Sequence, residues 1–448
     1  VRFVGRPGGQ RSIVKTPRPE VASGRYPPPV ADTTPRRWLP PTPPPVGKRM
    51  AVRVTPDALR QIRAGHPWVF DRAVTSVSHE GAAGDLAVVF DRNRRFAAIG
   101  LWDPASPIRI KILHSGAPLP IDGAFFRARL GEALARRSGL TSSESTTAFR
   151  LVHGENDGLP GLVVDRYADV LVIKLYAAAW WPHLPDVVEA LDEHVRSTAI
   201  VIRLARNIAA DMAGLATDGE VVAGHLADST VEFLENGLRF TADVVRGQKT
   251  GHFLDQRDNR QRVRVAAADA DVLDVFCHTG GFSTYAAAGG ARLVHSVDRS
   301  EPALAAAIAH MDLNVGVTRG CEHRTSRGDA FEVLDALAQG RQAYDIVVID
   351  PPSFAAREAD VDAAVRAYRK LTELGLRVLA PGGLLVQASC SSRVSRDVFV
   401  ETVEAGVAAA GATLASIDVT GQAVDHPIGF PEGAYLKAVF ARVNPEVR

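Results

Sequence analysis

Strands and helices alternate regularly between residues 271 and 419, and this pattern constrains the fold more than any other feature of the chain. Short apolar runs typical of strands are separated by segments whose apolar residues have helical spacing. Such alternation is typical of βαβ units, in which consecutive strands lie parallel. We therefore predict a Rossmann-like, doubly wound α/β fold with a mostly parallel sheet over residues 241–448. The strand-like runs are 272–276, 293–298, a short run near Arg324, 344–350, 383–388 and 413–419, and the helix-like segments begin near 282 or cover 301–314, 361–378 and 397–410.

Three segments with other patterns precede this α/β domain. Residues 1–49 contain twelve of the 28 prolines and ten Lys or Arg against two Asp or Glu, which predicts a disordered Pro/Arg-rich tail. Residues 50–118 contain short apolar runs separated by Gly, Asp, Asn and Pro, which predicts a small β-rich domain. Residues 119–240 combine strand-like runs with amphipathic helices at 121–145 and 184–195, which predicts a central α+β domain.

Charge, cysteine content and hydropathy exclude several classes of protein. The net charge is +1, and since residues 1–49 carry +8, the remainder is mildly acidic and does not bind nucleic acid by bulk charge. Three cysteines are too few for a disulfide framework. No apolar run reaches the ~20 residues that a membrane span requires. We therefore expect a cytoplasmic protein with no metal cofactor and no membrane contact.

Polar and glycine residues follow the predicted strands at the positions where a doubly wound sheet binds its ligands. Asp274 in the first strand precedes a Gly280-Gly281 pair, which lets the backbone turn sharply and approach a ligand. Asp298 can accept hydrogen bonds from ribose hydroxyls, and Asp329 can face an adenine edge. The spacing differs from G-x-G-x-x-G, which favours a ligand without a pyrophosphate. The residues expected to bind the cofactor are Asp274, Thr279, Gly280, Gly281, Phe282, Asp298 and Asp329.

The segment Asp350-Pro351-Pro352-Ser353-Phe354 follows the fourth predicted strand of the α/β domain. Because prolines fix the backbone and lack an N–H donor, their carbonyls and the Asp350 side chain can face a substrate base. Phe354 could stack on such a base. Enzymes that methylate an exocyclic amine of a base use a similar turn, so the turn indicates a base without choosing the atom. We expect Pro351, Pro352 and Phe354 to bind substrate.

Cys390 follows the fifth predicted strand on the same sheet edge and indicates cytosine carbon 5 as the acceptor. Carbon 5 is a poor nucleophile, but a thiolate that adds to carbon 6 makes it enamine-like and able to take a methyl group. Protonated Asp350 would assist by donating to the ring nitrogen. The alternative is that Cys390 is a small buried hydrophobic residue, and we take Cys277 and Cys321 to be structural in this way.

Several long motifs occur in one order from residue 50 to the C-terminus. They are HPWVF at 66–70, GENDGLPG at 154–161, DRY at 165–167, TG at 250–251, FLDQR at 253–257, NR at 259–260, DHP at 425–427 and YLK at 435–437. Together they resemble the bacterial 23S rRNA cytosine-5 methyltransferases that carry an N-terminal PUA domain. The resemblance implies a class I methyltransferase domain, S-adenosyl-L-methionine as methyl donor, RNA as substrate and Cys390 as nucleophile.

The resemblance also places Gln256 and Arg257 near the cofactor and makes residues 50–118 a PUA-like RNA-binding domain. Taken by charge alone, Arg257 and Arg260 fit phosphate contacts and helix-surface charges equally well. The chain departs from many cytosine-5 RNA methyltransferases at Ser353, near which they carry a second cysteine. Release of the product would then proceed without that thiol.

Two other functions stay open beside cytosine-5 methylation. One is methylation of a guanine or an exocyclic amine in rRNA without a covalent intermediate, in which case Cys390 is structural. The other is a non-catalytic RNA-binding factor of ribosome assembly that has kept the fold. The expected partner in each case is RNA, and a homodimer is open as the assembly.

Overall fold

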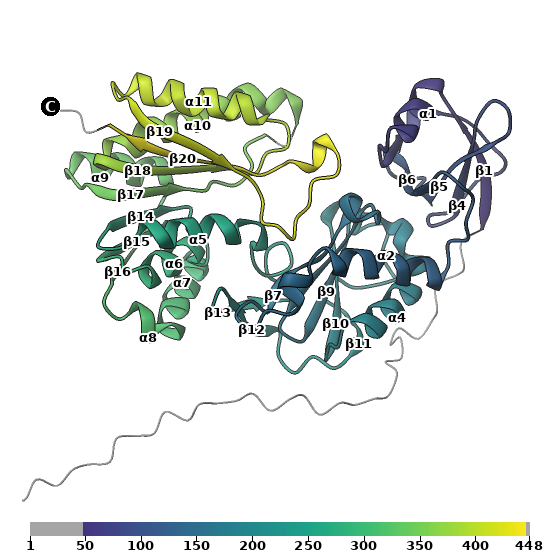
Figure 1. Ribbon diagram of the computed structural model, residues 1–448, viewed down its shortest axis with the longest axis horizontal. Helices are drawn as coiled ribbons and strands as arrows, with labels where there is room; N and C mark the ends of the chain where they lie inside the picture. Colours follow the sequence, from purple (N-terminus) through teal and green to yellow (C-terminus); the bar gives the residue numbers. More distant parts are fainter. Residues whose placement is uncertain (1–47, 356, 445–448) are drawn as a thin grey trace, which may run out of the picture. The chain divides into compact units, whose positions relative to one another are not determined.

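Three sheets of five or more strands organise the described chain, in the regions 49–115, 148–224 and 271–443, as Figure 1 shows. The structure is a computed structural model, and it describes residues 48–355 and 357–444. The predicted disorder of residues 1–47 lies outside the described residues, and the first strand begins at Arg49, inside the predicted tail. Among the described residues, no helix is both long and apolar enough to cross a lipid bilayer.

The N-terminal region forms a six-stranded sheet with the order β2-β6-β5-β4-β1-β3. Helix α1 (Pro56–Arg63) begins after Thr55, whose hydroxyl accepts a hydrogen bond from the backbone N–H of Ala58. The predicted β-rich character of this region is confirmed. The strands are β1 (Arg49–Val54), β2 (Trp68–Phe70), β3 (Val74–Val77), β4 (Leu86–Phe90), β5 (Phe96–Trp102) and β6 (Ile108–Ser115).

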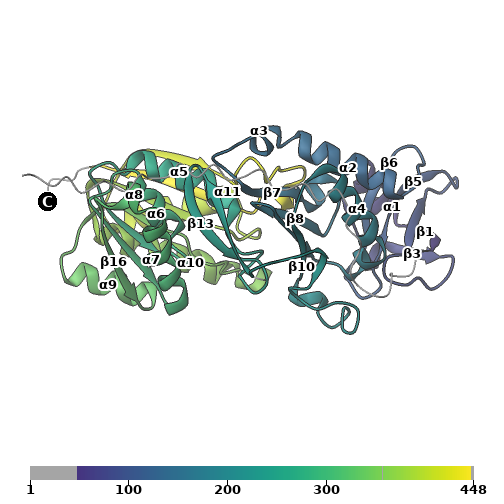
Figure 2. The ribbon, with the colours of Figure 1, turned by 90° about the horizontal axis from the view of Figure 1, so that it is seen from below.

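The central region forms a five-stranded sheet with the order β11-β10-β9-β8-β7. Helices α2 (Gly123–Ala135) and α4 (Leu184–His194) lie side by side on it, as Figure 2 shows. The strands are β7 (Ala148–His153), β8 (Leu162–Tyr167), β9 (Val170–Leu175), β10 (Ala199–Leu204) and β11 (Val221–Gly224).

The single helix predicted over residues 121–145 is wrong in its length. Helix α2 ends at Ala135, and a short helix α3 (Ser138–Thr141) follows. The chain leaves the helix at Arg137, whose buried guanidinium turns inward and donates to Asp157 Oδ2 at 2.7 Å. A buried charge needs such a partner, and this requirement outweighs the helical spacing of the sequence.

The C-terminal region carries seven strands in the order β16-β15-β14-β17-β18-β20-β19. All neighbours pair in parallel except β20, which runs antiparallel to both β18 and β19. The order runs outward from β14 in both directions, so the switch point lies between β14 and β17. The predicted doubly wound sheet is therefore confirmed. The strands are β14 (Asp271–Val275), β15 (Leu293–Asp298), β16 (Glu322–Arg327), β17 (Tyr344–Ile349), β18 (Leu379–Ser389), β19 (Leu414–Thr420) and β20 (Lys437–Val443).

Helices cover both faces of this sheet, as Figure 1 shows. Successive strand residues point to opposite faces, so Val272 and Leu273 belong to different hydrophobic cores. Burial on both faces explains the nearly continuous apolar runs of the sequence. One face packs against α5 (Arg257–Ala266), α6 (Gly281–Ala288) and α7 (Glu301–Leu313), with the short α8 (Val315–Thr318) after α7, and the other against α9 (Ala330–Gln339), α10 (Val361–Arg377) and α11 (Arg396–Ala409).

A hairpin of β12 (Thr230–Glu235) and β13 (Leu238–Asp243) joins the central and C-terminal regions. Phe233 and Phe240 of the hairpin share one core with Tyr167 of β8 and Tyr285 of α6. The expected domain boundary between residues 240 and 241 falls inside β13. The hairpin therefore belongs to both packing units.

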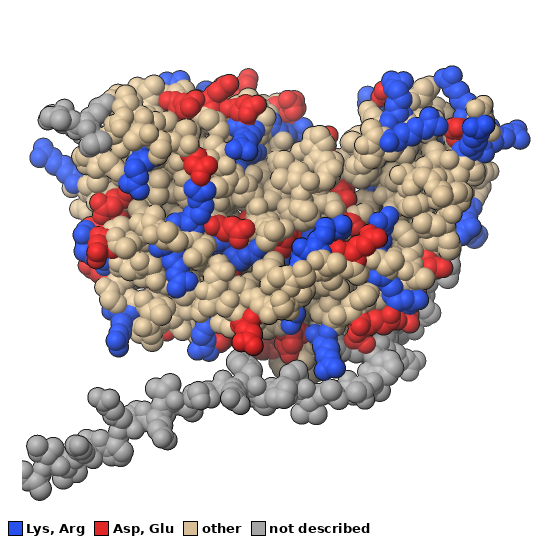
Figure 3. All heavy atoms as spheres, in the orientation of Figure 1, with Lys and Arg blue, Asp and Glu red and all other residues tan. Residues whose placement is uncertain are grey.

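Basic and acidic side chains are interspersed over the described parts of the face that Figure 3 shows. This mixture agrees with a net charge of +1 and with the absence of one uniformly basic surface on that face. On that face, a contact with a polyanion must therefore use local groups of basic residues.

A buried polar cluster around Asp425 ties the C-terminal segment to the central sheet. Asp425 Oδ1 lies 2.7 Å from Arg257 Nη2, and its Oδ2 accepts from the backbone N–H of Arg150 at 2.8 Å. The backbone carbonyl of Asp425 accepts from Arg137 Nη2 at 2.8 Å. Although burial alone would raise the pKa of Asp425, His426 and Arg257 hold that pKa below its ordinary value. The carboxylate is therefore ionised and fully paired inside the protein.

We predict that Arg257→Met lowers the free energy of unfolding by about 3–5 kcal/mol, because it leaves a buried carboxylate without its cation. Arg262→Met on the same helix is the matched control, since its ion pair with Asp418 is largely exposed and contributes at most about 1 kcal/mol. Denaturant unfolding measures both. Because the pKa of Asp425 is lowered, the stability from the pair is present at neutral pH and is lost as acid protonates the carboxylate. Equal effects of the two variants would contradict the prediction.

Candidate active site

The carboxyl ends of β14, β15, β17 and β18 lie along one edge of the sheet, because these strands are parallel neighbours. Asp274 lies near the end of β14, and Asp298 ends β15. Asp350 directly follows β17, and Cys390 directly follows β18. The fold thus brings four of the residues singled out in the sequence to one edge.

The loop after β14 has an unusual backbone conformation. Phe276, His278 and Gly280 have φ angles of 62°, 49° and 72°, in the left-handed region that non-glycine residues rarely adopt. A Cβ at Gly280 would lie 2.6 Å from the Cβ of Ala307, so only glycine fits there. Such conformations persist where surrounding contacts enforce them, and they cluster at functional sites.

Three hydrogen bonds enforce this loop. The Cys277 N–H donates to the Val297 carbonyl at 3.0 Å, and the His278 N–H donates to Asp298 Oδ2 at 3.0 Å. His310 of α7 holds the Thr279 carbonyl through Nδ1 at 2.8 Å. Asp298 therefore fixes the loop while its half-buried carboxylate stays at the ligand edge.

Asp274 is buried and has one carboxylate oxygen without a protein partner. Its Oδ2 accepts from both the backbone and the hydroxyl of Ser283, at 2.9 and 2.6 Å, whereas Oδ1 has no hydrogen-bond partner. Burial raises the pKa of Asp274 to about 6. An unpartnered buried oxygen is costly unless a ligand bonds to it. The residues of this edge therefore fit a ligand such as the predicted cofactor.

The other predicted cofactor residues occupy varied positions. Phe282 is buried in the core between the sheet and α6, so it supports the loop by packing. Asp329 is exposed and caps α9, since its Oδ1 accepts from the Phe331 N–H at 2.9 Å. Gly281 begins α6 beside the side chain of Arg260.

Gln256 and Arg257 differ in what their side chains can reach. Gln256 is buried, accepts from Asn259 Nδ2 at 2.7 Å and hydrogen-bonds to the Asp350 carboxyl group. The Arg257 guanidinium is occupied by Asp425, and that of Arg260 by Glu235. Both arginines are buried in ion pairs, so they are neither helix-surface charges nor open phosphate contacts. The expected contact of Arg257 with the cofactor stays a prediction. Gln256 connects the FLDQR motif to Asp350.

Asp350 is a half-buried carboxyl group with an altered pKa. Burial first, and then the negative charge of Asp255, raise the pKa of Asp350 to about 7. At neutral pH a large fraction of Asp350 is therefore protonated and able to donate. Of the residues that follow it, Pro352 is exposed, and half-buried Phe354 packs against Tyr368 with ring centroids 5.2 Å apart. Pro351 is buried.

Cys390 is half-buried beside Asp350 and several polar groups. Burial and the Asp350 charge raise the pKa of the Cys390 thiol, whereas Lys249 acts in the opposite direction. Lys437, which pairs with Ser389 across β18 and β20, binds the backbone carbonyls of Ser391 and Val394. The other two cysteines lie elsewhere: Cys277 is buried in the loop after β14, and Cys321 precedes β16.

Four residues that the sequence did not single out surround this site. Asp255 Oδ2 accepts from Lys249 Nζ and from the Tyr435 hydroxyl, each at 2.8 Å. The Tyr435 carbonyl in turn accepts from Lys437 Nζ at 3.0 Å. Asp255 lies within the FLDQR motif, and Lys249 directly precedes the TG motif. A charged residue in or beside a motif was therefore the sequence signal that could have identified them. Tyr435 and Lys437 lie in the YLK motif near the C-terminus.

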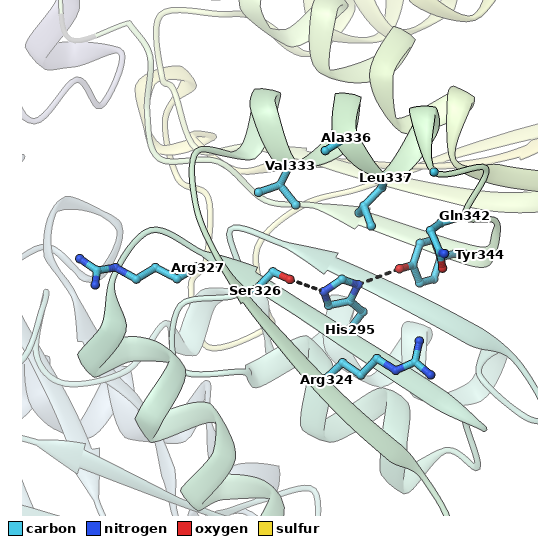
Figure 4. Close-up of a pocket in the computed structure, with 10 residues that line it drawn as sticks. His295, Arg324, Ser326, Arg327, Val333, Ala336, Leu337, Gln342 and Tyr344 are labelled. Atoms are coloured by element: carbon cyan, nitrogen blue, oxygen red, sulfur yellow. Dashed lines mark hydrogen bonds between the residues drawn. The ribbon is translucent and has the colours of Figure 1, made fainter.

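A cavity of about 520 Å³ lies away from this edge, between the sheet and α9. His295 in the middle of β15 contacts Tyr344 Oη at 2.7 Å and Ser326 Oγ at 2.8 Å, as Figure 4 shows. Arg324 and Arg327 of β16 line the same cavity. Because the described residues that line it include none from the loops that follow β14, β15 and β17, we do not assign the cofactor to it.

Comparisons with known proteins agree with this arrangement. Residues 150–436 match the family described as S-adenosylmethionine-dependent methyltransferase, and residues 52–115 match a PUA-like domain. The chain is 48% identical to "Ribosomal RNA large subunit methyltransferase" of Deinococcus radiodurans, with 88% of this chain and 98% of the relative covered. It is 34% identical to "Ribosomal RNA large subunit methyltransferase I" of Alteromonas mediterranea, with 88% and 99% covered.

Two solved structures share the fold. A putative SAM-dependent methyltransferase from Streptococcus mutans aligns with a TM-score of 0.74 at 22% identity, over 88% of this chain and 99% of that chain. A putative methyltransferase complexed with SAH aligns with a TM-score of 0.75 at 22% identity, over 88% and 100%. Together with the match over residues 150–436, this agreement leads to one conclusion: the chain belongs to the S-adenosylmethionine-dependent methyltransferase family, with a PUA-like domain before its catalytic unit.

Proposed function

We propose that this protein methylates carbon 5 of a cytosine in large-subunit (23S) rRNA through a transient covalent bond between Cys390 and the base. The observation that carries the proposal is the position of a half-buried thiol and a half-buried Asp350 carboxyl group at one sheet edge, where the pKa of Asp350 is raised to about 7. Asp274 and Asp298 lie at the same edge. The names of the relatives, which are large-subunit rRNA methyltransferases, support rRNA as the substrate.

The chemistry needs a nucleophile, a proton donor and a base. The Cys390 thiolate adds to carbon 6, forming a C–S bond, while Asp350 gives its proton to the cytosine ring nitrogen. Carbon 5 then carries the electron pair that forms the new C–C bond. Bound S-adenosyl-L-methionine would supply the electrophilic methyl group, and its sulfonium would leave as the neutral thioether of S-adenosylhomocysteine. A base accepts the carbon-5 proton, the ring nitrogen returns its proton to Asp350, the C–S bond to Cys390 breaks, and the thiolate is restored.

RNA must present the target cytosine outside a helix, because carbon 5 and carbon 6 need access to their faces. The PUA-like region offers the local positive charge for such a contact. Residues 50–118 hold nine Lys or Arg and six Asp or Glu, whereas residues 119–448 have a net charge of −10. We therefore propose that the PUA-like region binds the RNA next to the target cytosine.

Cys390→Ala is expected to abolish formation of 5-methylcytosine, because the base is no longer activated. The test incubates the purified protein, S-adenosyl-L-methionine and unmodified 23S rRNA, and then identifies methylated nucleosides by mass spectrometry. Cys321→Ala is the matched control and should keep full activity, since that thiol lies before β16.

Full activity of Cys390→Ala would sink the covalent mechanism. Methylguanosine or an N-methylated base as the product would instead support the chemistry without a covalent intermediate. Absence of any methylated product, together with absence of cofactor binding, would support the non-catalytic assembly factor.

The pH dependence of kcat/KM tests the role of Asp350. Because the pKa of Asp350 is raised to about 7, the donor form is present below that pH and disappears above it. Because the Cys390 thiolate becomes more abundant as the pH rises while the donor form of Asp350 declines above about 7, we expect kcat/KM to rise with pH below about 7 and to level off above it. Asp350→Asn has no such donor, so it should lose roughly 10²–10⁴-fold of the rate and its kcat/KM should keep rising through pH 7. A wild-type profile that keeps rising through pH 7 without levelling off would contradict proton donation by Asp350.

Asp298 is expected to hold the ribose of the methyl donor. Asp298→Ala should weaken binding of S-adenosyl-L-methionine roughly 10- to 100-fold in titration calorimetry, since a hydrogen bond to a charged group contributes about 1.5–3 kcal/mol. Asp335→Ala is the control, because Asp335 lies on the outer side of α9 in an exposed pair with Arg377. Unchanged affinity of Asp298→Ala would remove Asp298 from the cofactor site.

A further inference from the structure

Lys249 lies in the connection between β13 and α5 in a strained backbone conformation. Its φ angle is 56°, in the left-handed region that a lysine rarely occupies. The backbone carbonyl of Lys249 accepts from Lys174 Nζ of β9 at 2.9 Å. Strain of this kind persists only where the surrounding structure enforces it, and it marks segments with a positional task.

The Lys249 ammonium is fixed at both of its sides. Its Nζ lies 2.8 Å from Asp255 Oδ2 and 4.3 Å from the centre of the Phe253 ring. That ring contacts His278 of the cofactor loop, with centroids 5.1 Å apart. The ammonium therefore lies next to the cofactor loop and is about one-third exposed, so it can act on a neighbouring group without being fully desolvated.

Asp255 connects this ammonium to the strands that carry Cys390. Its Oδ2 also accepts from the Tyr435 hydroxyl, and the Tyr435 carbonyl accepts from Lys437 Nζ. Lys437 pairs with Ser389, the residue before Cys390. Asp255 Oδ1 is buried and has no hydrogen-bond partner. The contacts thus run without a gap from Lys249 to the strand end that carries the thiol.

Charged and titratable groups on several elements interact electrostatically with Cys390. Carboxylates disfavour its thiolate, and ammonium groups favour it. The groups are Lys249 and Asp255 from the segment before α5, Asp350 after β17, Tyr368 of α10 and Lys437 of β20.

We propose that Lys249 is a positioning residue whose ammonium, held by Asp255 and Phe253, favours the thiolate of Cys390 over the thiol. The inference rests on the proposed function for its role in catalysis, although the thiolate itself can be measured without RNA. Asp255 serves as the anchor that keeps the ammonium in place. The ammonium stabilises the thiolate of Cys390, whereas burial and the Asp350 charge destabilise it.

The direction of the charge effects agrees with this assignment. Burial and Asp350 raise the pKa of the Cys390 thiol, and Lys249 is the cation that lowers it. Although burial alone would raise the pKa of Asp255, Lys249 and His426 hold it below its ordinary value, so the anchor stays ionised. Burial lowers the pKa of Lys437 to about 8, so that second ammonium is partly lost in mild alkali.

The test measures the alkylation rate of Cys390 by iodoacetamide across pH in the full chain, without RNA or methyl donor. Trypsin separates the three cysteines, because Cys390 lies in peptide 378–393, Cys277 in 265–292 and Cys321 in 320–324. Lys249→Met keeps the length of the side chain but removes its charge. We expect Cys390 to react about tenfold more slowly at pH 7.5, as an upward shift of one pKa unit predicts.

Three further variants interpret the result. Lys249→Arg keeps the charge and should retain the wild-type rate within about threefold, which a merely structural lysine would not require. Lys370→Met removes an exposed ammonium on α10 and should change nothing. Lys249→Gln replaces the methionine variant if thermal unfolding shows that Lys249→Met is not folded.

Wild-type alkylation rates in folded Lys249→Met or Lys249→Gln would overturn the proposal. The test is independent of the proposed function, since it follows the thiol and not methyl transfer. If Cys390→Ala were fully active but Lys249→Met slowed alkylation, the covalent mechanism would fail and the role of Lys249 toward the thiol would stand.

Discussion

The buried ion pair between Arg257 and Asp425 is the interaction on which the rest of the site depends. The two residues are 168 positions apart, and the pair holds the start of α5 against the C-terminal segment. Asp425 also accepts from the Arg150 backbone in β7, so the central sheet is attached to the same carboxylate. The chain that leaves this cluster continues to Tyr435 and Lys437, whose contacts reach Asp255 and the end of β18. A change in the pair therefore reaches the thiol through backbone position.

Two carboxyl groups near the thiol, buried Asp255 and half-buried Asp350, have opposite pKa shifts, and their surroundings explain why. Asp255 bonds to an ammonium and a phenol, and its pKa is lowered although it is buried. Asp350 has a neutral amide partner and negative neighbours, and its pKa rises to about 7. One group thus stays an anion that anchors Lys249, and the other holds a proton near neutral pH. Such separation of two similar groups is how one site provides both charge and proton donation.

The sheet edge gathers these groups for a topological reason. Strand order reverses between β14 and β17, so the loops after these strands separate and leave room for a ligand. Phe276 and His278 adopt left-handed backbone conformations in the loop after β14, and Lys249 adopts one in the segment before α5. Stabilising contacts from His310 and Lys174 offset this strain.

The sequence by itself determined the doubly wound sheet and the positions of Asp274, Asp298, Asp350 and Cys390, because strand periodicity and the residues that end each strand are local signals. It left β20 and the hairpin β12–β13 unassigned, and it overextended α2, because these depend on pairing and on a buried arginine. The sequence could not decide whether the arginines of α5 are buried or exposed, because a strongly basic helix resembles a surface helix until its ion-pair partners are known. Only the tertiary structure decided that Arg257 and Arg260 are buried in ion pairs. It also joined Lys249, Asp255 and Tyr435 in one polar cluster, which Lys437 connects to the strand that precedes Cys390. The physical reason is distance along the chain: Asp255 and its partner Tyr435 are 180 residues apart, and no local pattern encodes a charge environment assembled from such remote segments.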